Sequence, residues 1–237
     1  MEHRELTLQP RLRMLADLVP PGAVVADVGT DHGYLPVWLL QHGKIPRAIA
    51  SDINAKPLEH ARRTAAECGM SNRMEFRLCA GLDGFCPGEA DVIVIAGMGG
   101  ETIAAILEAA PWTASGNTAL LLQPMTKAEY LRIWLTDKGY SFTGEHLVFD
   151  KDFLYPIFIV TGGNTVKLTD EEAYAGVMLE GDPLYGMYLS QQMSRLRTRI
   201  DGLTRSGNES AIEEIRRLET LYGALAARKE KLHDHSS

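Results

Sequence analysis

The sequence has no apolar run long enough to cross a bilayer, and its first residues lack the charged-then-apolar order of a secretory signal. Both absences lead us to expect a cytoplasmic protein. Only three cysteines occur, Cys68, Cys79 and Cys86, and no two of them form a Cys-x-x-Cys pair. An odd number of unpaired cysteines argues against a disulfide framework, so we expect reduced thiols and no bound metal.

The chain also has no excess of positive charge: it contains 24 Lys and Arg and 31 Asp and Glu, which gives a net charge of −7. This balance does not by itself suggest a nucleic-acid-binding protein, since affinity for phosphates comes from Lys and Arg. The distribution is uneven, however. Residues 190–231 hold nine basic and six acidic side chains, which fits either a modest basic surface or an ordinary solvated helical face.

The first two thirds of the chain alternate between short apolar runs and amphipathic stretches, which predicts a parallel sheet covered by helices on both faces. The expected strands are 23–28, 48–53, 74–78, 91–96 and 119–122, and the expected helices are 6–19, 34–42, 57–68, 101–109 and 127–138. Two further apolar runs, 146–149 and 155–160, have only a turn between them and predict an antiparallel hairpin. This is an α/β pattern, a Rossmann-like class I methyltransferase sheet that ends in an antiparallel hairpin.

The last third of the chain has a helical period of its own. Two series of apolar residues predict two antiparallel helices that pack as a coiled coil. The series are 189, 193, 196, 200 and 203, and 211, 215, 218, 222 and 225. Ser206-Gly207-Asn208 would form the turn between them, so each helix can cover the other and we expect a monomer. The glycine pair Gly162-Gly163 predicts a boundary between a methyltransferase domain, 1–162, and a helical coiled-coil domain, 163–237.

The stretch that organises the first domain is Ala23–Val28 followed by Asp27-x-Gly29-x-x-x-Gly33, a strand, a glycine turn and the start of a helix. The Gly-x-Gly-x-x-Gly pattern of dinucleotide enzymes, whose second glycine makes room for a pyrophosphate, is absent. A nucleoside without phosphates therefore fits better, and S-adenosylmethionine is the expected cofactor. An NAD-dependent oxidoreductase is disfavoured for the same reason.

The ends of the next strands supply further candidates. Asp52 is placed to accept hydrogen bonds from ribose hydroxyls, or alternatively to cap the following loop. Residues 80–82 follow the third strand, where an adenine ring would lie. Gly97-Met98-Gly99-Gly100 follows the fourth strand and could clear space for a flat base, or simply pack a helix closely on the sheet.

Four motifs together resemble the bacterial tRNA (adenine-22-N1)-methyltransferase family, TrmK. They are Leu8-x-x-Arg11-Leu12, residues 26–36 (ADVGTDHGYLP), residues 95–100 (IAGMGG) and Leu121-Leu122-Gln123-Pro124. The resemblance covers essentially the whole chain and implies methylation of N1 of an adenine in the D-arm region of tRNA. Two positions depart from the family pattern: Ala80 stands where Asp or Asn is common, and Met125 where Gln-Pro-Asn is common.

The positions of the strand ends and the resemblance to this family together predict the residues of the site. The residues that we expect to bind the cofactor are Asp27, Gly29, Thr30, Gly33, Asp52, Ile53, Asn54, Ala80, Gly81, Leu82, Ala96 and Gly97. Those expected to meet the substrate are Arg11, Tyr34, Met98, Gly99, Gly100, Gln123 and Pro124.

Adenine N1 carries its own lone pair, so methyl transfer needs alignment more than proton removal beforehand. Asp31 is our first choice of catalytic residue, to stabilise the cationic product or take a proton from its exocyclic amine, and His32 is the second. Asp31 could equally well position the cofactor or cap the next helix, and His32 and Tyr34 could be packing residues. The target base must leave its pairing or stacking to expose N1.

Two other functions compete with this one. The first is methylation of another RNA site or a small molecule. The second, from a different class, is a catalytically silent RNA-binding adaptor that keeps the fold, for which the Ala80 departure is the argument.

Overall fold

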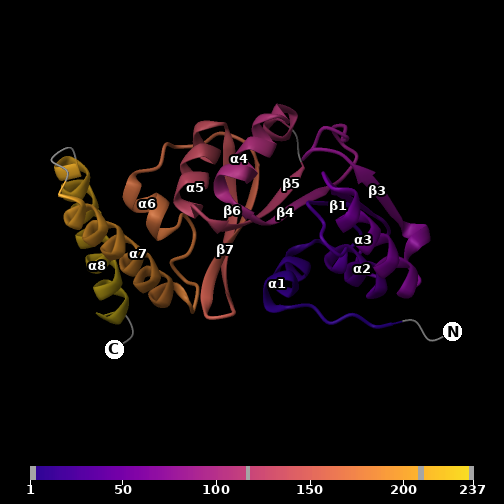
Figure 1. Cartoon of the computed structure of the whole chain (residues 1–237), viewed down its shortest axis with the longest axis horizontal. Coiled ribbons are helices and arrows are strands. Elements are labelled where there is room, and N and C mark those ends of the chain that lie inside the picture. The colour runs from indigo at the N-terminus through magenta and orange to yellow at the C-terminus, as the bar shows by residue number, and fades with distance from the viewer. Residues whose placement is uncertain (1–3, 116–117, 208–210, 235–237) are drawn as a thin grey trace.

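The computed structural model describes residues 4–115, 118–207 and 211–234, and its centre is a seven-stranded sheet (Figure 1). The strands are β1 Val25–Val28, β2 Ala48–Asp52, β3 Met74–Leu78, β4 Val92–Gly99, β5 Ala119–Thr126, β6 Tyr140–Asp150 and β7 Phe153–Gly162. Their order is β3-β2-β1-β4-β5-β7-β6, with β1 to β5 parallel and β7 antiparallel to both neighbours. The predicted doubly wound sheet with a hairpin at its end is confirmed.

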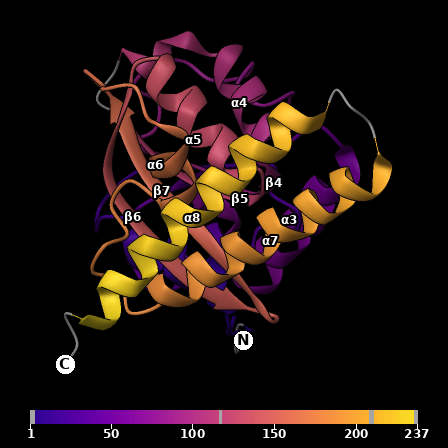
Figure 2. The same cartoon turned by 90° about the vertical axis from the view of Figure 1, so that its left-hand side faces the viewer.

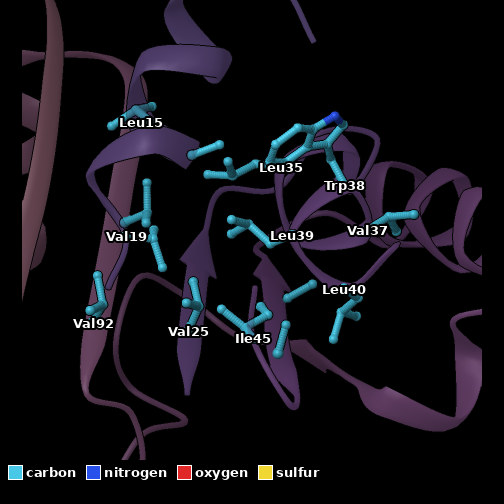
Figure 3. Close-up of a cluster of buried hydrophobic side chains, with 14 of the residues drawn as sticks. Leu15, Val19, Val25, Leu35, Val37, Trp38, Leu39, Leu40, Ile45 and Val92 are labelled. Atoms are coloured by element: carbon cyan, nitrogen blue, oxygen red, sulfur yellow. The ribbon is translucent and has the colours of Figure 1, made fainter. Parts of the chain in front are cut away.

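Helices cover both faces of this sheet. They are α1 Pro10–Leu18, α2 Tyr34–Gln41, α3 Ala55–Glu67, α4 Gly100–Glu108 and α5 Ala128–Asp137, with 3-10 turns at Ser71–Arg73 and Pro111–Ala114. The side chains of β4 alternate between the two cores: Val92 and Val94 pack with α1 and α2 (Figure 3), and Ile93 and Ile95 with α4 and α5. Burial on both faces is why these strands read as unbroken apolar runs.

Several elements differ in length from the sequence prediction. Strand β4 continues to Gly99 because a bulge at Gly97 lets pairing resume, with Met98 opposite Pro124 and Gly99 opposite Thr126. Both strands of the hairpin are longer than expected, and Asp150, expected in the turn, ends β6. The first helix begins only at Pro10, whose ring suits the first helical position.

The C-terminal part consists of α6 Asp170–Ala175, α7 Tyr185–Ser206 and α8 Ile212–Asp234. Helices α7 and α8 lie side by side (Figure 2), and their shared core contains most of the predicted seam, including Leu196, Leu218 and Leu225. Asn208 of the expected turn lies outside the described residues, and supercoiling of the pair stays a prediction. Helix α6, which has a capping box between Thr169 and Glu172, was not predicted from the sequence.

A buried ion pair joins the helical part to the sheet. Arg132 of α5 donates to Glu145 of β6 at 2.6 Å, and neither side chain is exposed. The same guanidinium donates to the carbonyl of Ala173 and to the hydroxyl of Tyr188 in α7. Burial lowers the pKa of Arg132, but the neighbouring Glu145 and Tyr188 raise it above its ordinary value, so the group stays charged.

Among the described residues, no helix is both long and apolar enough to cross a membrane.

Candidate active site

The glycine turn after β1 lies at the carboxyl edge of the sheet and is held to β2. The backbone N–H groups of Gly29 and Thr30 both donate to the carbonyl of Ser51, at 2.8 and 2.9 Å. Gly29 and Gly33 have φ values of +78° and +68°, which favour glycine. A side chain at Gly33 would press on Ala61 of α3, so this glycine also sets the spacing of two helices.

Three buried polar side chains, Asp27, Thr30 and Ser51, lie at this turn. Among the described residues, the hydroxyl of Ser51 has no hydrogen-bond partner, and the hydroxyl of Thr30 has none apart from the neighbouring Asp27 carboxyl, whose pKa it lowers. Burial raises the pKa of the neighbouring Asp27 carboxyl to about 6, the Thr30 side chain opposes this rise, and the charge of Asp52 adds to it. Buried hydroxyls are normally hydrogen-bonded, so this cluster has the chemistry to receive a polar, cationic ligand. Ser51 was missed from sequence because it reads as part of the strand.

Two exposed apolar side chains stand at the ends of β2 and β3. Ile53 is 67% exposed and Leu78 is 62% exposed, and neither side chain belongs to a hydrophobic core cluster of the described residues. Asp52, between β2 and Ile53, accepts a hydrogen bond from the backbone of Asn54 at 2.7 Å, so the capping alternative for Asp52 holds in this structure. The second carboxylate oxygen of Asp52 takes no part in that hydrogen bond and is available for a ribose contact. Leu78 was not among the sequence candidates.

The turn after β3 divides into exposed and buried positions. Ala80 is exposed, whereas Leu82 is 3% exposed and packs in the core beneath α4. Gly81 has a φ of +51°, and a side chain there would press on Ile106. Only the backbone of Leu82 is therefore available to a ligand.

The glycines after β4 serve different purposes. Gly97 has a φ of +77° with open space where a side chain would lie, and its N–H donates to Gln123 Oε1 at 3.2 Å. A side chain at Gly100 would clash with the backbone of Lys127, so this glycine brings α4 close to the start of α5. The interpretation as close helix packing is therefore confirmed at Gly100, whereas space for a base at Gly97 stays a prediction.

Arg11 and Gln123, expected to meet the substrate, are joined in one internal network. The Arg11 guanidinium donates to Asp150 at 2.7 Å and to Gln123 Oε1 at 3.0 Å, and it lies over the ring of Tyr155. Gln123 is fully buried and also donates to the carbonyl of Pro124. Arg11 thus ties α1 and the hairpin to β5 and orients the amide next to Gly97.

Asp31, His32 and Tyr34 form a column of polar and aromatic groups with His60 of α3. The His32 ring stacks on Tyr34 and on His60, with centroids 5.1 and 4.9 Å apart. Asp31, whose side chain is 75% exposed, lies 3.3 Å from His32 Nε2. His60 was missed from sequence, since one histidine in a polar helix carries no signal; its Nδ1 is buried without a partner.

The same column contains the group of described residues with metal-ligand chemistry, because the ligand atoms of Asp31, His32 and His60 lie within 4.8 Å of one another. The two imidazole planes differ by only 11° and face each other. Lone pairs in parallel stacked rings do not converge on one point, so the arrangement favours a stacking surface. The expectation of no bound metal stays a prediction.

Comparison with known proteins extends over both parts of the chain. A family model described as a methyltransferase domain matches residues 8–158. The tRNA (adenine(22)-N(1))-methyltransferase of Bacillus subtilis (strain 168) is 36% identical over 188 residues, 79% of this chain and 77% of that protein. The crystal structure of the B. subtilis m1A22 tRNA methyltransferase TrmK has a TM-score of 0.84 and 29% identity, covering 94% of this chain and 99% of that one. A candidate tRNA (m1A22) methyltransferase of Streptococcus pneumoniae, in complex with S-adenosyl-L-methionine, has a TM-score of 0.78 and 32% identity, covering 92% and 97%.

Proposed function

The chain belongs to the tRNA (adenine(22)-N(1))-methyltransferase family, and from this premise we propose how its residues carry out S-adenosylmethionine-dependent methylation of N1 of adenine 22 in tRNA. The observation that carries the assignment of residues is the glycine turn, where three buried polar side chains and two exposed apolar ones surround the carboxyl edge of the sheet. Membership of this family supports an enzyme that acts on tRNA.

The donor side of the site fits S-adenosylmethionine, which supplies the methyl group when bound. The Thr30 and Ser51 hydroxyls would hydrogen-bond its polar end, and the buried Asp27 carboxylate would face its positive charge. The free oxygen of Asp52 would accept from the ribose, and Ile53 and Leu78 would flank the adenine ring. Burial of those two apolar side chains on binding would add a hydrophobic contribution.

The acceptor side is the column of Asp31, His32 and Tyr34. Stacked rings offer a flat surface for a displaced base, and the exposed Asp31 carboxylate would stabilise the positive charge that N1 methylation leaves on the ring. His32, next to Asp31, would take part in removing a proton from the exocyclic amine. The open space at Gly97, whose N–H is held by the buried Gln123 amide, completes the acceptor edge.

The domain boundary, the oligomeric state and the location remain proposals. We place the division after Gly162, at the end of β7, with 163–237 as the helical domain that orients tRNA. A chain cut near Asn164 would leave Arg132 and Glu145 without their helical partners, so point variants test this role better than truncation. The mutual packing of α7 and α8 supports a monomer, and the tRNA substrate supports work in the cytoplasm.

Transfer of a labelled methyl group to tRNA transcripts tests the function. The full-length protein should label a transcript with adenine at position 22 and leave the same transcript with guanine there unlabelled, and digestion should yield 1-methyladenosine. Labelling of a different nucleotide would support another RNA site. Binding of S-adenosylmethionine and tRNA without transfer would support the adaptor alternative.

A further inference from the structure

A cleft of about 310 Å³ lies between the methyltransferase sheet and the helical domain, outside the site described above. One wall comes from the end of β5 and the start of α5, and the other from α6 and α7. Its lining residues are Thr126, Lys127, Glu129, Tyr174, Gln192, Arg195, Leu196 and Arg199. This volume is at the small end of the range for ligand sites and suits a single nucleotide.

Gln192 is the feature of this cleft that packing does not explain. Its side chain lines the cleft, the residue is 2% exposed, and its Nε2 has no hydrogen-bond partner. A buried amide donor without a partner costs stability, whereas a leucine of similar volume would avoid that cost. A polar ligand in the cleft would give the amide the acceptor that the protein does not provide.

The charges of the cleft fit a whole nucleotide better than a bare phosphate. Arg195 is exposed, and the described residues give it no hydrogen-bond or ion-pair partner, whereas Lys127 pairs with Glu101 at 2.5 Å and Arg199 pairs with Glu214. Glu129 adds a carboxylate that would repel a phosphate alone. In a nucleotide the same carboxylate can accept from a ribose hydroxyl or an exocyclic amine.

The cleft opens at the edge of the sheet where the acceptor base would lie. Thr126 ends β5 and pairs in register with Gly99 of β4, and β4 is the neighbour of β1, which carries the glycine turn. Two strand spacings separate β5 from β1, about 10 Å. One RNA can therefore reach both the cleft and the glycine turn.

We propose that this cleft binds a second nucleotide of the tRNA, with its phosphate on Arg195 and its base or sugar on Gln192 and Glu129. The site holds the RNA while the target adenine occupies the column at Asp31. This inference rests on the proposed function, because it takes tRNA as the substrate.

Two substitutions in full-length protein, Arg195→Ala and Gln192→Leu, test the site, with Arg197→Ala as the matched control. Arg197 lies on the same helix, does not line the cleft and pairs with Asp201 at 3.4 Å. Arg195→Ala should weaken tRNA binding about tenfold and reduce the slope of log affinity against log salt by about one, whereas Arg197→Ala should change neither. Affinity for S-adenosylmethionine should be unchanged in all three.

Gln192→Leu separates binding from folding. If the cleft binds RNA, this variant should bind tRNA more weakly than the wild type. Its Tm should be unchanged or higher, because the substitution removes an amide without a hydrogen-bond partner. A lower Tm with unchanged tRNA affinity would show that Gln192 is structural and would overturn the site. Equal slopes of log tRNA affinity against log salt for Arg195→Ala and the wild type would also overturn the site. If those slopes are equal while the wild type still methylates position 22, the cleft is refuted and the function stands; if the wild type methylates no tRNA, the function itself fails.

Discussion

The terminal methyl group of Met98 occupies the space that a side chain at Gly29 would need. This contact joins the motif after β4 to the glycine turn after β1, so the donor and acceptor parts of the site meet at one glycine. Gly29 also has a φ of +78°, and either property alone would disfavour a side chain there.

Gly29→Ala should reduce affinity for S-adenosylmethionine by about tenfold or more, because the new methyl group displaces Met98 and strains the turn. Gly22→Ala is the matched control, since Gly22 has a φ of +81° and no atom within 4 Å of the new methyl group. Both variants should lose about 1–2 kcal/mol of stability from backbone strain. Calorimetry measures the affinity, and equal affinities in the two variants would refute the role of the Met98 contact.

Ser51→Ala should weaken cofactor binding about tenfold without lowering Tm, because the hydroxyl that it removes has no partner among the described residues. Thr113→Val provides the opposite case. The Thr113 hydroxyl bonds the carbonyl of Ala110 and the hydroxyl of Tyr140, at 2.8 and 2.7 Å, so its removal should cost about 1 kcal/mol and leave cofactor affinity unchanged. A destabilised Ser51→Ala with normal affinity would contradict the proposed contact.

Asp31→Ala should reduce the rate of transfer at saturating substrates by about 100-fold with little change in cofactor affinity, because in the proposed site the exposed Asp31 carboxylate stabilises the cationic product. Asp52→Ala should do the reverse and mainly weaken cofactor binding. Single-turnover rates and calorimetry separate the two effects. If affinity for the cofactor falls in step with the rate in Asp31→Ala, then Asp31 is a cofactor ligand instead.

Because of Asp27, the free energy of unfolding should decrease as pH rises. Its pKa rises from 3.8 to about 6 on folding, so between these values the unfolded chain has released a proton that the folded chain still holds. Stability therefore decreases through this window, by about 3 kcal/mol in total above pH 6. Urea unfolding of Asp27→Asn should show an advantage over the wild type that grows by about this amount from pH 4 to 7. Parallel stability curves for the two proteins would contradict the raised pKa.

Arg132→Met should lose about 3–5 kcal/mol of stability, because it leaves Glu145 as a buried charge without its cationic partner. It should also loosen α6 and α7, which hydrogen exchange can detect. Arg217→Met removes an exposed pair with Asp170, which lies 2.5 Å away, and should cost less than about 1 kcal/mol. Equal losses in denaturant would show that the buried pair does not fasten the helical domain.

Local patterns in the sequence were enough to predict the parallel strands, the hairpin and the two long C-terminal helices, because each follows from its own periodicity and turn residues. The same patterns located the glycine turn and Asp52. They misjudged the ends of β4 and β5, since a bulge at Gly97 that prolongs pairing depends on the neighbouring strand.

The sequence by itself determined the candidate site residues at strand ends. These residues can be predicted because the carboxyl ends of parallel strands meet at one edge of the sheet, where ligands bind. The tertiary structure alone decided which side chains share a surface: His60 with His32, Arg11 with Gln123 and Asp150, and Arg132 with Glu145 and Tyr188. These partners lie 13 to 139 positions apart in the chain. Nothing in a local window records which distant charge or ring will be buried next to another, and that burial sets both the charge of Asp27 and the attachment of the helical domain.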